Sequence, residues 1–222
     1  MSIEKFLTDP ADFDSIMRPG NAQFSLVMNL QGGMTMNHLG TRCLETERLI
    51  LRKAVESDAP KMFENWTGDA EVTRYLTWNA HGSISDTQGY IHYLMENYSQ
   101  PDFYQWIIQL KSTGEPIGNI GVVKVSENIR GAHIGYCMGK KWWHQGIMSE
   151  AFSKVIEFLF SQVGMNRIEA RHDVRNPHSG GVMIKCGLMR EGILRQADVN
   201  TSGLCDMAVY SILKSDWEST QK

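Results

Sequence analysis

The sequence of 222 residues lacks several features that would assign it to a large class. No apolar run approaches the roughly 20 residues that a membrane-spanning helix needs, which excludes an integral membrane protein. The first residues (MSIEKFLTDPADFD) have neither the basic region nor the apolar segment of a signal peptide. We therefore expect a cytoplasmic protein.

Metal-binding and nucleic-acid-binding signals are also missing. The four cysteines lie far apart and form no CxxC pair, so we expect no metal site and reduced thiols: Cys43, Cys137, Cys186 and Cys205. With 22 basic and 25 acidic residues the net charge is −3, which argues against binding of nucleic acid through a broad basic surface. We expect neither a nucleic acid nor a membrane as partner.

Three common catalytic and nucleotide-binding motifs do not occur. There is no GxxxxGK[ST] of a P-loop and no GxGxxG that follows a strand. A GxSxG turn, which carries the nucleophile of α/β-hydrolases, is absent as well.

The composition that is present, 42% hydrophobic and 21% charged, is that of an ordinary globular core. Residues 1–37 differ from the rest: two basic and four acidic residues give a charge of −2, which leaves −1 for 38–222. The pair Gly32-Gly33 has the backbone freedom of a linker. We therefore predict an N-terminal extension of uncertain role over 1–37 and one globular domain over 38–222.

The apolar pattern of the domain alternates between strands and helices. Seven segments read as strands: 48–53, 103–111, 116–125, 132–138, 166–174, 188–195 and 205–213. Four segments read as helices: 58–66, 84–98, 147–163 and 178–186. The turn residues 112–115 predict an antiparallel hairpin between the second and third strands. The fold class is therefore α/β (α+β).

Three places along the chain carry candidate chemistry. A strand, a turn and a helix that starts near Gly146 would leave free backbone N–H groups for an anion, although such a junction is also an ordinary turn. Ser179 would either cap the helix that follows Asn176 or face a ligand. Asp198, which follows a strand, would be a base or an ordinary surface carboxylate.

Taken in order, the motifs cover about residues 44–214: LETERLILR at 44–52, PIGNIG at 116–121, IGY at 134–136, WWHQGIMSEA at 142–151, Asn176 with Ser179, KCGL at 185–188, EGILR at 191–195, and Asp206 with Tyr210 and Ser211. This series resembles the GNAT (Gcn5-related) N-acetyltransferases, in particular the RimJ/RimL-like branch that acetylates ribosomal proteins. The resemblance implies a GNAT fold, with a mixed, mostly antiparallel central sheet of about seven strands flanked by helices.

The resemblance also implies acetyl-coenzyme A as cofactor and assigns residues to it. The strand backbone at Tyr136, Cys137 and Met138 would pair with the pantetheine arm and stabilise the oxyanion. Asn176 would also bind this arm. Backbone amides would hold the diphosphate, with His144 beside it rather than acting as a base: His144, Gln145, Gly146, Ile147, Met148 and Ser149.

The catalytic residues implied by the resemblance are Ser179 and Asp198. Ser179 would lie near the thioester sulfur and protonate the departing thiolate, and Asp198 would be the base that takes the proton of the amine, often through water. Glu115 and Glu150 are weaker candidates for the base, and Glu150 is expected to support the helix start instead. Cys137 is expected to be buried beside the cofactor and not to act as a nucleophile, because transfer in this family is direct.

Two departures from the family pattern stand out. Met148 replaces the small last residue of the phosphate loop, and Leu188 replaces an aromatic packing residue. A glycine or alanine lets the chain approach the diphosphate closely, so Met148 is expected to shift the ligand or to narrow the site.

The expected function is transfer of an acetyl group to a primary amine, most simply a protein N-terminal amine of the ribosomal-protein type. The alternatives are a small-molecule amine (a polyamine, an amino acid or an antibiotic) and a non-catalytic acyl-CoA sensor. The resemblance makes a homodimer plausible. Six aromatic residues would line the acceptor groove or belong to the core: Trp66, Tyr75, Trp78, Tyr90, Tyr93 and Tyr104.

One hypothesis concerns the extension. The codons of residues 31–36 would suit a purine-rich ribosome-binding site, which would make Met36 the natural start and the first 35 residues foreign to the protein. Mass spectrometry of the native N-terminus tests this hypothesis.

Overall fold

The computed structural model of the chain describes residues 36–220. The predicted extension over 1–37 and the hypothesis about Met36 therefore concern residues that lie almost entirely outside this range. Among the described residues, no helix is both long and apolar enough to cross a bilayer.

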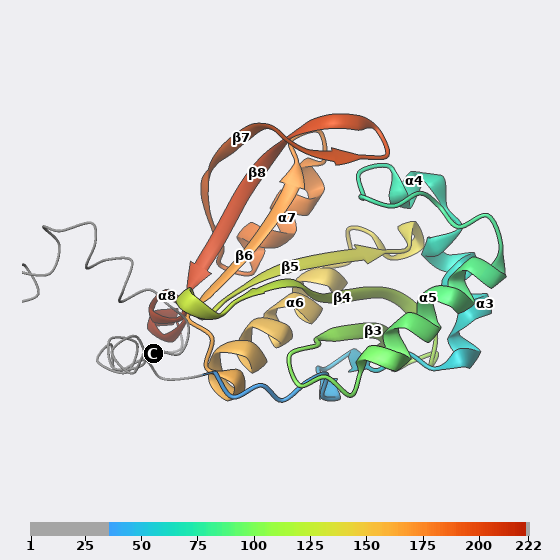
Figure 1. Cartoon of the computed structure of the whole chain (residues 1–222), viewed down its shortest axis with the longest axis horizontal. Coiled ribbons are helices and arrows are strands. Elements are labelled where there is room, and N and C mark those ends of the chain that lie inside the picture. Colours follow the sequence, from blue (N-terminus) through green and yellow to red (C-terminus); the bar gives the residue numbers. More distant parts are fainter. Residues whose placement is uncertain (1–35, 221–222) are drawn as a thin grey trace, which may run out of the picture. The chain divides into compact units, whose positions relative to one another are not determined.

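The domain is built on one sheet of eight strands in the order β1-β2-β3-β4-β5-β6-β8-β7 (Figure 1). The strands are β1 (Leu44–Glu45), β2 (Leu49–Arg52), β3 (Gln105–Leu110), β4 (Pro116–Ser126), β5 (Gly131–Met138), β6 (Arg167–Asp173), β7 (Met189–Asn200) and β8 (Gly203–Leu213). All neighbours are antiparallel except β5 and β6. The mixed, mostly antiparallel sheet and the hairpin of β3 and β4 are confirmed, and the additional strand is the two-residue β1.

Helices cover both faces of the sheet. They are α3 (Ala59–Met62), α4 (Ala70–Thr73), α5 (Ile84–Asn97), α6 (Ile147–Phe158), α7 (Pro177–Lys185) and α8 (Lys214–Thr220). The long α6 packs on one face, and α3 and α5 contribute to a second apolar cluster that includes Ile107 and Cys137 of the other face. The sequence pattern predicted α5, α6 and α7 nearly to their ends but did not indicate α8.

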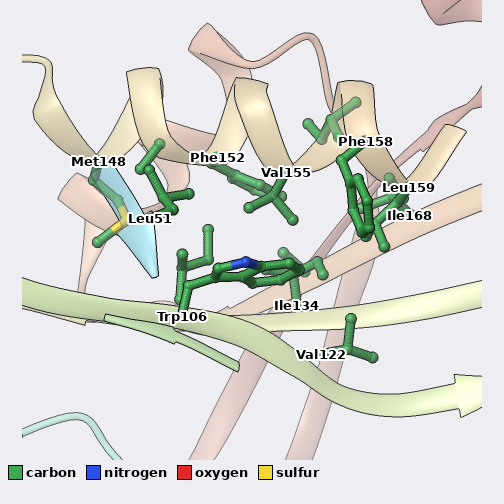
Figure 2. Close-up of a cluster of buried hydrophobic side chains, with 14 of the residues drawn as sticks. Leu51, Trp106, Val122, Ile134, Met148, Phe152, Val155, Phe158, Leu159 and Ile168 are labelled. Carbon is green, nitrogen blue, oxygen red and sulfur yellow. The ribbon is translucent and has the colours of Figure 1, made fainter. Parts of the chain in front are cut away.

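The main core lies between α6 and the sheet, where Trp106 lies under Phe152, Val155 and Phe158 (Figure 2). The stripe predicted on this helix is fully buried, because apolar residues at helical spacing share one face. Trp106 meets the ring of Phe158 edge-on, with 5.9 Å between the centroids. Each large side chain buried here stabilises the fold by roughly 1.5–3 kcal/mol. The helix continues as one wide turn, Leu159–Val163, and ends at Gly164, whose φ is 82°.

The parallel pair β5 and β6 opens along its length. Gly131–Ile134 pair with Arg167–Ala170, and beyond these residues the two strands no longer pair (Figure 1). The strands are joined by the crossover helix α6 and not by a tight turn, so no turn holds their far ends in register. Their divergence leaves one backbone edge of β5, residues 135–138, without a neighbouring strand.

Strand β7 is longer than predicted. We expected it to end at 195, but a bulge at Leu194–Asp198, where Gln196 has a φ of 48°, lets β7 resume its pairing with β8 as far as Asn200. A bulge absorbs extra residues in one strand while the ladder continues, which the sequence pattern does not reveal.

Candidate active site

A cavity of about 1430 Å³ lies beside the opening between β5 and β6. One wall, here called the donor wall, consists of β5 and the starts of α6 and α7. The opposite acceptor wall consists of residues 71–105 and the β7–β8 hairpin. All but one of the predicted site residues line this cavity: Tyr136, Cys137, Met138, His144, Gly146, Ile147, Met148, Ser149, Asn176, Ser179 and Asp198.

The exception, Gln145, belongs to the loop that starts α6, and its carbonyl accepts a hydrogen bond of 3.1 Å from Arg48. In residues 144–149, here called the amide loop, His144 and Gly146 have φ values of 60° and 72°. Within the described chain, the backbone N–H groups of the amide loop donate to no other residue. Six free amides at the positive end of a long helix form an anion-binding site.

The amide loop is held in place from the N-terminal strands. The Glu150 carboxylate accepts hydrogen bonds from Thr46 Oγ1 (2.5 Å) and from Arg48 N (3.0 Å) and Nε (2.6 Å). Burial opposes ionisation of Glu150, but these hydrogen bonds outweigh it and lower its pKa. Glu150 thus supports the helix start, as expected, and does not line the cavity. Glu115 does not line it either, because it pairs with Asn65.

Of the two effects expected of Met148, narrowing of the site by its side chain is contradicted, whereas a shift of the ligand stays a prediction. The Met148 side chain is only 7% exposed and points into the core beside Leu51 and Trp106 (Figure 2). Only the backbone of Met148 belongs to the amide loop, so its side chain does not narrow the anion site. Leu188 is buried in the same core.

The open edge of β5 offers backbone groups to a ligand that lies along it. One of them is already engaged, because the Met138 carbonyl accepts a hydrogen bond of 2.7 Å from Trp143 Nε1. Cys137 is buried and its thiol donates to Asn119 Oδ1 at 2.9 Å. Burial raises the pKa of this thiol to about 12, so Cys137 stays protonated and is not a nucleophile.

Ser179 does not cap α7. The N-cap is Asn176, which makes no side-chain cap bond, and Ser179 lies in the first turn with its N–H directed to the Asn176 carbonyl at 3.2 Å. Its hydroxyl lies instead 3.0 Å from the hydroxyl of Tyr136, which also donates to the Ser179 carbonyl at 3.0 Å. Burial raises the pKa of Tyr136, so the pair is a protonated, cavity-facing donor.

The start of α7 is fixed by a close approach to β6. A Cβ on Gly180 would lie 2.6 Å from His172 Nε2, so only glycine fits here. His172 Nδ1 bonds to the Asp173 carbonyl at 2.8 Å, which fixes the ring. This packing sets the position of Ser179 and of Asn176, whose side-chain amide has no hydrogen-bond partner within residues 36–220.

On the acceptor wall, Asp198 lies in β7 opposite Cys205 and not in a loop after the strand, because β7 extends past the bulge. Its side chain is exposed, and Oδ1 accepts a hydrogen bond of 2.8 Å from the N–H of Val199. Asp198 and Ser179 thus line the same cavity from opposite walls.

The six aromatic residues divide into two groups. Trp66 and Tyr104 are fully buried in the core, whereas the other four line the cavity: Tyr75, Trp78, Tyr90 and Tyr93. The hairpin tip is fastened to this wall, since Thr201 donates from its N–H to Leu76 O (3.0 Å) and Ser202 from its hydroxyl to Arg74 O (2.8 Å). The acceptor wall is therefore one connected surface.

Sequence reasoning missed several residues of the cavity, among them His133, Arg171 and His178. His178 packs edge-on against His144, with 4.7 Å between the ring centroids. His133 and Arg171 lie within strands and His178 in the first turn of α7, and none gives a signal in one sequence, because the neighbours of each come from other elements.

The free groups fit an elongated ligand that ends in phosphates. The amide loop suits a diphosphate, the unpartnered Asn176 amide and the open edge of β5 suit an amide-containing arm, and the two hydroxyls lie farther along the same wall. These are the features that an acyl-coenzyme A requires.

Comparisons with known proteins agree with this geometry. Residues 48–189 match the family model of the acetyltransferase (GNAT) domain. The uncharacterized N-acetyltransferase YoaA of Bacillus subtilis (strain 168) is 36% identical over 171 residues, which are 77% of this chain and 96% of that protein. The [ribosomal protein uS5]-alanine N-acetyltransferase of Escherichia coli (strain K12) is 24% identical over 184 residues, covering 78% of this chain and 92% of that protein.

A solved structure shares the fold. The Microcin C7 self immunity acetyltransferase MccE, determined in complex with acetyl-CoA and AMP, superimposes with a TM-score of 0.69 at 22% identity, covering 76% of this chain and 93% of that chain. The chain belongs to the GNAT family of N-acetyltransferases, enzymes that use acetyl-coenzyme A as the acetyl donor.

Proposed function

We propose that this enzyme transfers the acetyl group of acetyl-CoA directly to the α-amine of a protein N-terminus of the ribosomal-protein type. The observation that carries the proposal is one cavity with free amides and a hydroxyl pair on one wall and a carboxylate on the other. The relative from Escherichia coli, which is named for the alanine of ribosomal protein uS5, supports this acceptor class.

The donor wall binds and orients acetyl-CoA. The amides of the amide loop hold the diphosphate, and the Asn176 side chain and the open edge of β5 hold the pantetheine arm. Acetyl-CoA supplies a thioester, whose acetyl carbon is open to attack by an amine. The backbone N–H groups of 136–138 that face the opening stabilise the negative charge that develops on the carbonyl oxygen.

The hydroxyl pair serves the leaving group. Tyr136 donates its hydrogen to the Ser179 carbonyl and holds the Ser179 hydroxyl 3.0 Å away, and the hydrogen of that hydroxyl can turn from the Tyr136 oxygen toward the sulfur. A thiolate that receives a hydrogen bond and then a proton departs more easily. Burial keeps the Tyr136 phenol protonated, so it orients Ser179 without giving up its own proton, and the proton that Ser179 passes to sulfur is replaced by one that the acceptor nitrogen loses.

Asp198 serves the acceptor. An α-ammonium group must lose a proton before it attacks, and the exposed Asp198 carboxylate attracts this cation and takes its proton through water. Transfer is direct, because the buried Cys137 thiol stays protonated. The retained hydroxyl pair and carboxylate favour an enzyme over a non-catalytic acyl-CoA sensor.

The test combines binding with turnover. Calorimetry with acetyl-CoA measures binding, and thiol release is then followed with three acceptor groups: peptides with N-terminal alanine or serine, polyamines, and aminoglycosides. The same peptides with a blocked N-terminus and a free lysine are the matched control. We expect turnover with the free N-termini alone. Preference for a small amine would contradict the acceptor class, and binding without turnover on any amine would contradict the function.

A further inference from the structure

One titratable side chain of the cavity has no role in the mechanism above. His133 lies in β5, opposite Lys124 of β4 and Glu169 of β6, in the last stretch where β5 and β6 still pair. The strands diverge after the next residue. His133 therefore stands at the closed end of the opening.

The imidazole points to the acceptor side of the sheet. Side chains alternate along a strand, and Ala132 and Ile134 are buried under α6. His133 therefore shares the opposite face with Gly135 and Cys137, and all three line the cavity. Because Gly135 has no side chain, it does not separate the imidazole of His133 from the space beside the open edge of β5.

His133 is half-buried, yet its ring makes no hydrogen bond or ion pair with any residue between 36 and 220. Two other half-buried histidines of that range have a hydrogen-bond partner: His38 bonds to Tyr104 and Glu127, and His81 to Thr87. A half-buried imidazole with both nitrogens free is available to a ligand in the cavity.

The surrounding charges suit a group that gains a proton and then loses it. Burial and Arg171 of β6 lower the pKa of His133, with a small contribution from Lys124 of β4, so the ring is neutral at neutral pH. Glu169 of β6 and Asp198 of β7 act in the opposite direction and would stabilise an imidazolium. Asp198 thus acts electrostatically on His133 from the other wall.

We propose that His133 is the first acceptor of the proton that the acceptor ammonium loses, and that Asp198 stabilises the imidazolium that results. This inference rests on the proposed function and refines one step of it. The Asp198 carboxylate then assists the removal of the proton in two ways, by stabilising the His133 imidazolium and through water.

The step balances. One N–H bond of the ammonium breaks and an N–H bond forms on His133; the freed lone pair forms the C–N bond at the acetyl carbon. As the C–S bond breaks, its electron pair leaves with sulfur, which takes the second nitrogen proton by way of Ser179. The products are the amide, the thiol and one proton, which His133 releases to water in the cavity.

The test uses the full chain with His133→Gln and His133→Ala. Since a general base contributes about 10²–10⁴-fold, we expect His133→Gln to lower kcat by at least about 100-fold with an unchanged Kd for acetyl-CoA. In the wild type, kcat/KM should fall on acidification only below the ordinary imidazole value of about 6.5, because the pKa of His133 is lowered by burial, and this acid limb should vanish in the variant. Added imidazole should partly restore His133→Ala.

Two controls separate the possible outcomes. His92→Gln changes an exposed histidine of α5 and should match the wild type; thermal melting and acetyl-CoA binding establish that each variant is folded. A folded His133→Gln variant with turnover within threefold of the wild type and the same acid limb overturns the role of His133 and leaves the proposed function intact. A wild type that turns over no amine overturns both.

Discussion

The donor wall and the acceptor wall of the cavity are built differently. On the donor wall each group is fixed by contacts with other elements: Ser179 by Tyr136 and by the packing of Gly180 on His172, and the amide loop by Glu150. On the acceptor wall Asp198 is exposed on a bulged edge strand, and Tyr75 and Trp78 come from the segment between α4 and α5, which has no regular structure. The donor wall is thus held by hydrogen bonds and close packing, whereas the carboxylate of the acceptor wall is exposed to solvent.

The largest expected effect on turnover comes from a change on the acceptor wall. Asp198→Asn keeps the shape of the side chain but cannot accept a proton or stabilise a cation, so kcat should fall by roughly 100–1000-fold. The Kd for acetyl-CoA should not change, because Asp198 is not on the donor wall. Steady-state kinetics and calorimetry measure the two quantities.

Asp102→Asn is the matched control, since Asp102 is another exposed carboxylate of the same wall. It should behave as the wild type. Ordinary activity of Asp198→Asn, or equal losses in both variants, would remove Asp198 from the mechanism.

The next largest effect on turnover is expected from a change on the donor wall. Ser179→Ala removes the hydroxyl nearest to the leaving group, and we expect kcat to fall about 10–100-fold. Tyr136 keeps its bond to the Ser179 carbonyl, so the loss in unfolding free energy should stay near ~1 kcal/mol. Stopped-flow thiol release and chemical denaturation measure both.

Ser153→Ala, on the exposed side of α6, provides the baseline for this experiment. If Ser179→Ala lost helix content with no change in turnover, Ser179 would be a structural residue of α7 only.

A third prediction concerns the packing that positions Ser179. Gly180→Ala would bring a Cβ within 2.6 Å of His172 Nε2, and such overpacking should cost about 1–3 kcal/mol of unfolding free energy. A Cβ on the adjacent Gly181 would meet nothing within 4 Å, so Gly181→Ala should be neutral or stabilise by up to ~1 kcal/mol. Thermal and urea unfolding compare the pair, and equal stabilities would show that the approach of α7 to β6 is not tight.

The smallest effect is a pH dependence where the two walls meet. Asp173 is fully buried, accepts hydrogen bonds from Arg175 and Asn200, and has a pKa of about 2 against an ordinary 3.8, chiefly because of the bond from Arg175. A lowered pKa stabilises the folded state above the unfolded value, so this contribution is complete above about pH 5 and is lost as the pH falls toward 2.

Arg175 is 46% exposed, so solvent screens the pair and we expect a contribution of only ~1 kcal/mol. Urea unfolding at pH 5 and at pH 3 should show a larger drop for the wild type than for Asp173→Asn. A parallel pH response of the two proteins would assign the acid sensitivity to other carboxylates.

The same contrast between the walls explains what the sequence could predict. The stripe of α6, its end at Gly164 and the hairpin of β3 and β4 follow from local periodicity and turn chemistry, and all three are confirmed. Motif order was enough to indicate the amide loop, Asn176 and Ser179, because the donor wall comes from consecutive elements of the chain.

What failed depends on three-dimensional neighbours. The bulge that keeps Asp198 within β7 is a pairing property of two strands, and the burial of Met148 depends on Leu51 and Trp106, far away in sequence. His133 had no signal, because the charges around it come from three other strands. Residues of the acceptor wall meet only after folding, so one sequence could not separate the lining tyrosines from the core ones.

The parallel seam between β5 and β6 has a mechanical consequence. All other neighbouring strands pair antiparallel, and most of them do so over longer stretches, whereas here pairing stops after Ile134 and Ala170. The sheet thus consists of two parts, β1–β5 and β6–β8, which are joined within the sheet by this short pairing, and the candidate ligand groups lie where the pairing has ended. A ligand in the opening would bond to β5 on one side and to the start of α7, which follows β6, on the other, so we expect it to add contacts between the two parts of the sheet.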